Sequence, residues 1–148
     1  MTTKRILDEA TKKALLGVAP MSSNSKFKFT PEVFSKVNVS EEFKPIFYIR
    51  GLTVDEAGTL DKLVSESASA AINKDLWNEK AFELTRKLIV DWENVFDIGS
   101  GEEISFIAES NSCAPSIFDM LTLIIKNQLF AQIMKMHGLL DTAKMGLP

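Results

Sequence analysis

The segment from Pro115 to Met136 constrains the fold of this chain more than any other part of the sequence. Drawn as one helix, it carries apolar side chains around nearly its whole circumference: Ile117, Phe118, Met120, Leu121, Leu123, Ile124, Ile125, Leu129, Phe130, Ile133, Met134 and Met136. A helix that is apolar all round must be enclosed by protein. The sequence predicts this helix from about Ser116 to His137, ending at Gly138.

Two interpretations of this segment stay open. In the first, the segment is the central helix of its own domain, which a chain of 148 residues is long enough to build. In the second, one face binds a partner, because methionine-bearing apolar surfaces suit adaptable binding. The candidate partner-binding side chains on that face are Phe118, Leu121, Ile125, Leu129 and Met136. A domain of this size has few other elements that could enclose about three turns of helix completely. A partner protein could therefore cover one face, as the second interpretation states.

Short strands and helices are predicted before this segment. Lys26–Phe29 alternates charged and apolar residues, as a half-buried strand does. Phe43–Gly51 is the best strand candidate, with Pro45 placed at its start or on an edge. Between them, Thr30 and Pro31 predict the cap and first turn of a short helix.

Two longer helices are predicted next. Thr53 and Glu56 form a capping-box pattern that opens the first of them. Asn73 or Asp75 caps the second, which carries an amphipathic stripe with steps of three and four: Trp77, Ala81, Leu84, Leu88, Trp92 and Val95. This stripe predicts a helix that continues through Trp92.

The stretch "VDWENVFDIGSGEEISF" (Val90–Phe106) predicts a change from helix to a small β-hairpin. Gly99 and Gly101 permit a tight turn, and apolar residues alternate with polar ones after it. Trp92 would cover the joint, while the acidic side chains of the turn would face water: Asp97, Glu102 and Glu103. The sequence therefore predicts a mainly α fold with a small β element (α+β), a helical domain with a short hairpin and one or two N-terminal strands.

The predicted organisation is one globular domain over residues 26–138. Residues 1–25 are expected to form a weakly docked helix, Lys4–Leu16, followed by a linker, because the helix has only a thin apolar stripe. Residues 139–148 are expected to be a flexible tail. The charged N-terminus lacks the apolar region of a secretory signal, and the charges within residues 115–136 argue against a membrane span.

Catalytic, cofactor and metal sites are not expected. Cys113 could be a nucleophile, but it lacks a basic neighbour in sequence and reads better as a small buried side chain. The acidic turn could hold a cation, but it lacks the ligand pattern of a calcium loop. Gly99–Gly101 lacks the lysine of a phosphate loop. Trp77 and Trp92 could stack a ligand, but they share the stripe of core positions.

The charge balance limits which classes of partner are expected. The net charge is −3 with no visible basic stripe, so no nucleic-acid partner is expected. The single cysteine excludes an internal disulfide and favours a reducing cytoplasm. The expected function is therefore protein binding without enzymatic activity.

Two segments, Val39–Ala57 and Val90–Phe106, together resemble a family of small proteins from tailed-phage tail operons, the tail assembly chaperones. The first is similar to its proline-bearing strand, "LT" turn and acidic helix start. The second is similar to its tryptophan, asparagine, aspartate, glycine turn and "EI-F" pattern, and an apolar helix follows in both. This chain has Ser105 where the family commonly has proline.

This resemblance implies a function in the host cytoplasm. Such chaperones bind the apolar, helical tape measure protein and keep it soluble and extended until the tail tube polymerises around it. Many are also made as a longer, frameshifted form that recruits the tail tube protein, and this chain would be the short form. Self-association is left open. The alternative is a structural tail or head–tail component that stays in the virion.

Overall fold

The structure is a computed structural model that describes residues 4–19, 21–69 and 71–138. Its helices are α1 (Glu9–Leu15), α2 (Val54–Ser67), α3 (Lys74–Leu88), α4 (Pro115–Phe118) and α5 (Leu123–Met136), with two short 3-10 helices, η1 (Glu32–Lys36) and η2 (Glu41–Phe43). Its strands are β1 (Lys26–Phe29), β2 (Ile46–Arg50), β3 (Ile89–Glu93), β4 (Ala108–Glu109) and β5 (Ser112–Cys113). The fold is mixed α+β, with helices and a small antiparallel sheet, as predicted in general terms.

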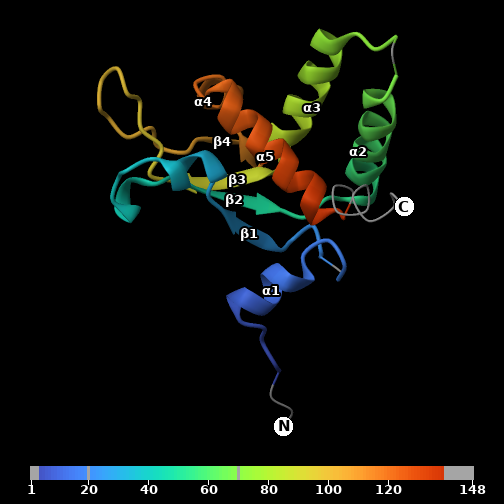
Figure 1. Cartoon of the computed structure of the whole chain (residues 1–148), viewed down its shortest axis with the longest axis horizontal. Helices are drawn as coiled ribbons and strands as arrows, with labels where there is room; N and C mark the ends of the chain where they lie inside the picture. The colour runs from blue at the N-terminus through green and yellow to red at the C-terminus, as the bar shows by residue number, and fades with distance from the viewer. Residues whose placement is uncertain (1–3, 20, 70, 139–148) are drawn as a thin grey trace.

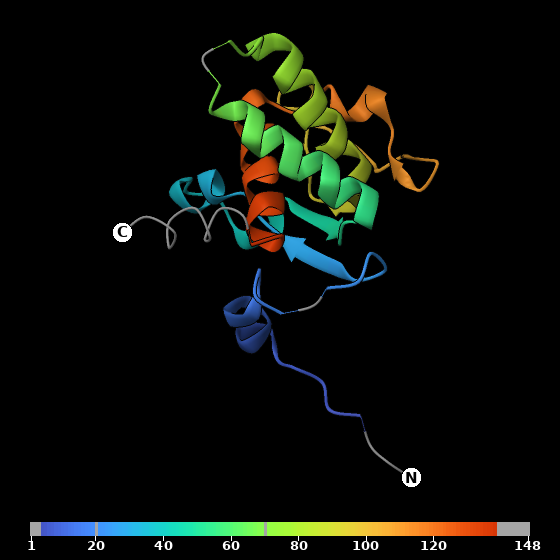
Figure 2. The same ribbon diagram turned by 90° about the vertical axis from the view of Figure 1, so that its right-hand side faces the viewer.

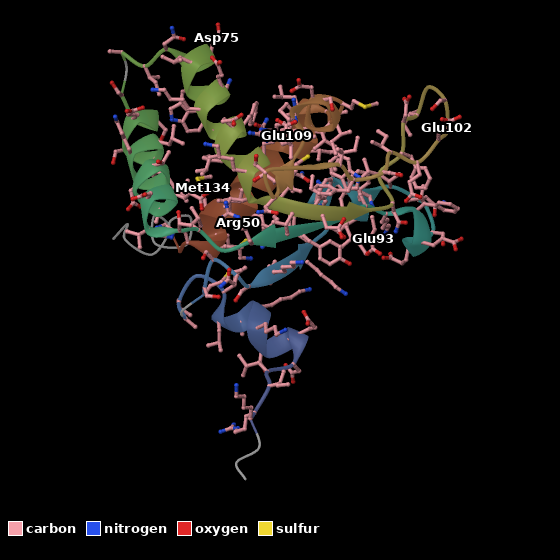
Figure 3. All side chains as sticks on the ribbon, turned by 180° about the vertical axis from the view of Figure 1, so that it is seen from behind. Arg50, Asp75, Glu93, Glu102, Glu109 and Met134 are labelled. Carbon is pink, nitrogen blue, oxygen red and sulfur yellow. The ribbon has the colours of Figure 1, made fainter. Side chains whose placement is uncertain are left out.

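Strands β1, β2 and β3 form an antiparallel sheet in chain order, and β4 pairs with β5 separately. Since paired residues share a face and alternate residues return to it, one face of the sheet is apolar: Phe27, Phe47, Ile49 and Trp92. The other face is polar: Lys28, Tyr48, Asp91 and Glu93. On it, the Tyr48 hydroxyl donates a hydrogen bond to Glu93 at 2.5 Å (Figure 3). A sheet with one apolar and one polar face is covered on the apolar face alone.

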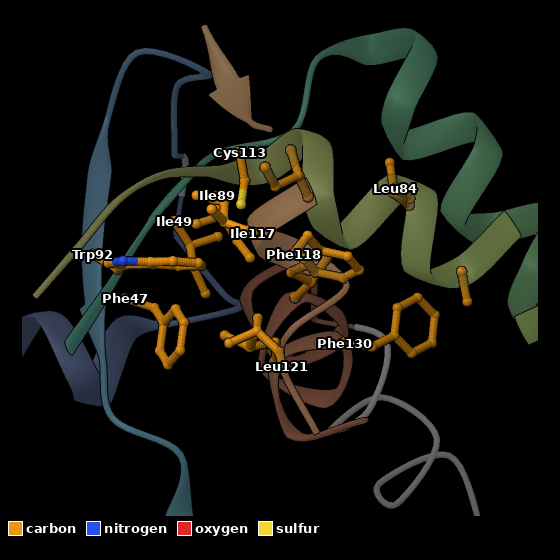
Figure 4. Packing of buried hydrophobic residues seen from close by; sticks show 14 of the residues in the cluster. Phe47, Ile49, Leu84, Ile89, Trp92, Cys113, Ile117, Phe118, Leu121 and Phe130 are labelled. Atoms are coloured by element: carbon orange, nitrogen blue, oxygen red, sulfur yellow. The ribbon is translucent and has the colours of Figure 1, made fainter. Parts of the chain in front are cut away.

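Helices α2, α3, α4 and α5 lie on one side of the sheet, and α1 lies beyond its β1 edge (Figures 1 and 2). The core forms between that helical layer and the apolar face of the sheet. Fully buried side chains from five elements meet there, among them Phe47, Leu60, Leu88, Ile89, Leu129 and Ile133. Figure 4 shows Phe47 and Trp92 of the sheet near Leu121 and Ile117 of the last segment. The core therefore joins the sheet to the helices that cover it.

Most local predictions before residue 88 are confirmed. Strand β1 has the predicted bounds, and β2 begins at the residue after Pro45. Thr53 caps α2 through a full capping box, and Asn73 rather than Asp75 caps α3 by accepting the N–H of Leu76 at 3.1 Å. These signals are local, since a cap or a strand start depends on residues within one turn.

The prediction that the α3 helix continues through Trp92 is wrong. The helix ends at Leu88, and Ile89–Glu93 forms β3. The buried stripe up to Leu88 is confirmed, but the β-branched Ile89 and Val90 favour a strand, and β2 provides a pairing partner. Trp92 is buried as predicted, on the face of a sheet instead of a helix.

The prediction of one helix from Ser116 to His137 is also wrong. Helix α4 ends at Phe118, and α5 begins after Thr122, whose side chain caps it by accepting the N–H of Ile125 at 3.4 Å. Because of this break, the apolar residues do not form one long helix that is apolar on every side. Two short helices with different directions can each turn apolar side chains into the same core, so no single helix needs to be enclosed.

The predicted hairpin around Gly99 is present as an irregular turn. Phe96 pairs with Glu103, the N–H of Asp97 donates to Glu102 at 2.9 Å, and Ile104 donates to Val95 at 2.7 Å. Gly101 has a φ of +75°, which glycine adopts without strain. Residues 104–107 belong to no strand, and the Ile107 carbonyl accepts the N–H of Ala114 at 2.9 Å.

An ion pair joins the end of β2 to the start of α2. Arg50 donates two parallel hydrogen bonds of 2.7 Å to the two carboxylate oxygens of Glu56, and Glu56 also accepts the N–H of Thr53 at 2.9 Å. The Arg50 guanidinium lowers the pKa of Glu56 from its ordinary 4.5 to about 2. The contact is therefore specific to the charged carboxylate.

Glu56→Gln is expected to lower the free energy of unfolding by about 1–2 kcal/mol at pH 7. Glutamine keeps the capping contact with Thr53 but loses the charge. Because the pKa of Glu56 is depressed in the folded state, its stabilisation is complete above pH 4.5 and is lost as the pH falls towards 2. Urea unfolding between pH 7 and 2 should show the difference between wild type and variant shrinking to nearly zero.

The matched control for this test is Glu41→Gln, which breaks an ion pair between the exposed Glu41 and the half-buried Lys44. It should leave stability unchanged at every pH, because exposed pairs contribute little. A constant difference between wild type and Glu56→Gln across the whole pH range would contradict the assignment of the charge to this pair.

Candidate partner-binding groove

The five predicted partner-binding side chains lie mostly in the core. Phe118, Leu121, Leu129 and Met136 are buried, and Ile125 is half-buried. In this fold, Phe118, Leu121 and Leu129 pack within the hydrophobic core of the chain. Met136 differs from them because it lines a surface hollow at the carboxyl end of α5. The structure therefore directs attention to the surroundings of Met136.

Two hollows lie on either side of α1, and together we name them the α1 groove. One has a volume of about 430 Å³ and the other about 540 Å³. They share Leu16 and Phe27 in their linings, so they adjoin. Both volumes are in the range of sites that bind partner side chains or ligands.

The floor of the α1 groove is apolar and comes from four parts of the chain: Leu16, Met21, Phe27, Phe29, Ile46 and Met136. Leu16, Met21, Phe27 and Phe29 are partly buried and pack against the edge of the core. Two of the floor residues are methionines, whose unbranched side chains adapt to the shape of a partner.

Helix α1 forms one wall of the groove and buries none of its own residues. Asp8 caps it by accepting the N–H of Thr11 at 2.7 Å, so the helix begins at Glu9 and not at Lys4 as predicted. Leu7 and Leu15 remain exposed while they line the groove. The wall is therefore an amphipathic helix whose apolar side is incompletely covered.

Close backbone contacts hold this wall in place. Gly17, directly after α1, has a φ of +84°, and a Cβ there would lie 2.5 Å from the carbonyl oxygen of Lys135. A Cβ at Gly51 would clash with the carbonyl of Ser22. Because only glycine permits such approaches, Gly17 lies directly against the end of α5 and Ser22 lies directly against Gly51, which follows β2. Helix α1 itself buries none of its residues.

The rim of the α1 groove is basic. It carries five lysines from three elements: Lys12 and Lys13 of α1, Lys26 and Lys28 of β1, and Lys135 of α5. Glu9 is the single acidic residue in the two linings, and it pairs with Lys12 at 3.4 Å. The groove therefore has a positive rim on a chain whose net charge is −3.

A second apolar surface lies at the junction of α4 and α5. Met120, Leu123 and Ile124 are each half or more exposed, and they follow or precede the break between the two helices. These three side chains are the accessible part of the segment that the sequence marks as a partner-binding helix. None of them lines the α1 groove.

Cys113 is buried, and burial raises the pKa of its thiol to about 12. Arg86 lies nearby and donates to the Cys113 carbonyl at 2.6 Å, and its positive charge lowers the pKa by less than burial raises it. A thiol in this state is protonated at neutral pH and is a weak nucleophile.

The acidic turn uses its carboxylates for its own backbone. Asp97 accepts from the N–H of Gly99 at 3.0 Å and from the Ser100 hydroxyl at 3.2 Å, and Glu103 accepts from Asn94 at 3.1 Å. Figure 3 shows Glu102 on the protruding loop. Among residues 4–19, 21–69 and 71–138, no cluster of three or more histidine, cysteine or carboxylate side chains is arranged to hold a metal ion.

Trp92 is buried, and Trp77 is partly buried against the core. The indole N–H of Trp77 donates to the carbonyl of Leu63 at 2.8 Å, and its ring contacts Phe130 edge-on. Trp92 likewise donates to Ile104 at 2.7 Å. Their polar atoms are thus paired within the chain, as the core interpretation expects.

Sequence analysis missed the α1 groove because no local pattern encodes it. Its rim lysines are separated by up to 123 positions along the chain and come together through the tertiary fold, including the β1–β2 pairing and the close approach of Gly17 to Lys135. The alternation in Lys26–Phe29 was the available signal, because it places Phe27 and Phe29 on one face with lysines between them.

Comparisons with known proteins leave the family of this chain open. In the part of the chain that the structure describes, no helix is both long and apolar enough to cross a membrane. No family model, no curated protein and no solved structure matches the chain.

Proposed function

We propose that this chain is a tail assembly chaperone that binds the tape measure protein of a tailed phage in the host cytoplasm. It keeps that protein soluble and extended while the tail is built. The proposal starts from the resemblance of Val39–Ala57 and Val90–Phe106 to such chaperones. It requires an accessible apolar surface on the folded chain, because a long apolar helix aggregates unless it is covered.

The α1 groove is the observation that carries this proposal. It offers an apolar floor and two exposed leucines, Leu7 and Leu15, beside a helix that buries none of its own residues. An amphipathic client helix inserts side chains spaced three and four residues apart into such a groove. Binding there needs no catalytic group, which agrees with the buried state of Cys113. The exposed Met120, Leu123 and Ile124 would extend the contact surface for a long client.

The test is co-expression with the tape measure protein from the same operon. We expect the tape measure protein to be in the soluble fraction with the wild-type chain and in the insoluble fraction without it. The double variant Leu7→Ser, Leu15→Ser should reduce the rescued fraction by about half or more, since apolar anchors dominate such interfaces. Circular dichroism should show an unchanged fold, because neither residue is buried.

The matched control is Ile98→Ser, which removes an apolar side chain that is 90% exposed on the turn, outside the groove. It should rescue as well as wild type. A tape measure protein that stays insoluble beside a folded, soluble wild-type chain would contradict the proposal. Detection of the chain at fixed copy number in purified virions would favour the structural tail or head–tail component instead.

A further inference from the structure

We infer that the α1 groove selects a partner segment of one chemistry: an amphipathic helix whose apolar face is flanked by aspartate and glutamate. This inference rests on the proposed function for the identity of the partner, and it adds the charge pattern of the segment that is bound.

The floor determines the class of the partner. Leu16, Met21, Phe27 and Met136 present hydrocarbon and thioether groups, which gain free energy by covering apolar side chains. A nucleic-acid backbone would leave this floor uncovered, since single strands bind through charge combined with stacked bases. The two aromatic floor residues, Phe27 and Phe29, are partly buried against the core and offer no open stacking platform. An apolar polypeptide face is the better match.

The rim determines the charge of the partner. Lys13, Lys28 and Lys135 line the larger hollow with Glu9, and Lys12 and Lys26 line the smaller one without an acidic residue. All five lysines are exposed, and Lys12 is paired with Glu9 at 3.4 Å. The ammonium group of Lys28 lies 5.9 Å from the ring centroid of Tyr48, on the polar face of the sheet.

This rim stands out because the rest of the chain is acidic. Removing its five lysines and one glutamate from the count leaves a strongly negative remainder, since the whole chain carries 17 basic and 20 acidic side chains. An acidic-flanked helix would be repelled by most of the surface and attracted at the groove. Charges arranged in this way fix the orientation of a partner and increase its association rate.

The experiment uses the full chain and two synthetic helical peptides with the same apolar face. One peptide carries aspartate and glutamate beside that face, and the other carries lysine and arginine. Fluorescence anisotropy should show the acidic-flanked peptide binding about tenfold more tightly at low salt, as a few rim ion pairs together would give. The preference should fall steeply with added salt, since exposed charges are screened within about 10 Å at 0.1 M.

The double charge reversal Lys13→Glu, Lys28→Glu should remove or invert the peptide preference. Its matched control is Lys74→Glu at the start of α3, next to Asp75, which Figure 3 places at the opposite end of the molecule from α1. That variant should keep the preference. Equal binding of both peptides by wild type, or an unchanged preference in the double variant, would overturn the inference. So would tighter binding of RNA or of anionic vesicles than of the acidic-flanked peptide.

The two proposals fail separately. If the chain rescues the tape measure protein but shows no peptide preference, the chaperone function stands and the charge inference is wrong. If it prefers the acidic-flanked peptide but fails to rescue the tape measure protein, the groove chemistry stands and the partner is a different protein.

Discussion

Replacing Leu129 with alanine is expected to lower the free energy of unfolding by about 2–5 kcal/mol, the cost of removing a large buried aliphatic side chain and leaving a cavity. Leu129 is 0% exposed in the middle of α5. Leu123→Ala in the same helix should change stability by less than about 0.5 kcal/mol, because Leu123 is 61% exposed. Urea or thermal unfolding of the two variants measures the difference directly.

This matched pair separates the two interpretations of the last apolar segment. Both substitutions remove the same atoms from the same helix, so helix propensity and chemistry cancel in the comparison. If Leu129 is a core residue, Leu129→Ala loses much of its stability. If Leu129 only binds a partner, Leu129→Ala stays stable but no longer binds that partner. Equal, small effects at both positions would contradict the burial of α5 against α3 and the sheet.

Sequence reasoning succeeded where one turn or one strand contains all the information. The capping box at Thr53, the cap at Asn73 and the alternation of Lys26–Phe29 are such cases. Each depends on hydrogen bonds or side-chain directions among residues that are neighbours in sequence. Their prediction therefore needed no knowledge of the tertiary structure.

It failed where a distant partner decides between two local states. Ile89–Trp92 continues the helical stripe of α3, yet pairing with β2 turns it into a strand. Thr122 lies within an apolar run that reads as one helix, yet its cap begins a new helix and lets Leu121 reach the core beside Phe47 and Ile117. In both cases tertiary packing overrides a periodic pattern.

The candidate site was harder to predict than the fold for the same reason. The sequence places Phe118, Leu121 and Leu129 among the candidate partner-binding side chains, because it does not show which other elements cover them. Their burial became visible only with the sheet and α3 in place. The α1 groove could not be predicted because its lining lysines are far apart in the sequence and lie together only in the folded chain. They are Lys13, Lys28 and Lys135.

Replacing Trp92 with alanine is expected to lower the free energy of unfolding by about 3–5 kcal/mol, the range for a buried aromatic side chain. Its ring contacts Phe47 and Phe106 edge-on at centroid distances of 5.8 and 5.5 Å. Its indole N–H also donates to the carbonyl of Ile104 at 2.7 Å. Trp92 therefore joins the sheet to the segment that follows the acidic turn.

Trp92→Phe tests that joining role apart from the loss of volume. Phenylalanine retains an aromatic ring but removes the N–H donor, so the Ile104 carbonyl loses its partner at a cost of about 1–3 kcal/mol. Hydrogen exchange should then speed up at the amides of Asp97 and Ile104, whose bonds hold the turn together. The exchange rates of the β1 and β2 amides should change only as much as the change in the global free energy of unfolding requires. Unchanged exchange at the turn would show that the acidic turn is held by its own hydrogen bonds and not by Trp92.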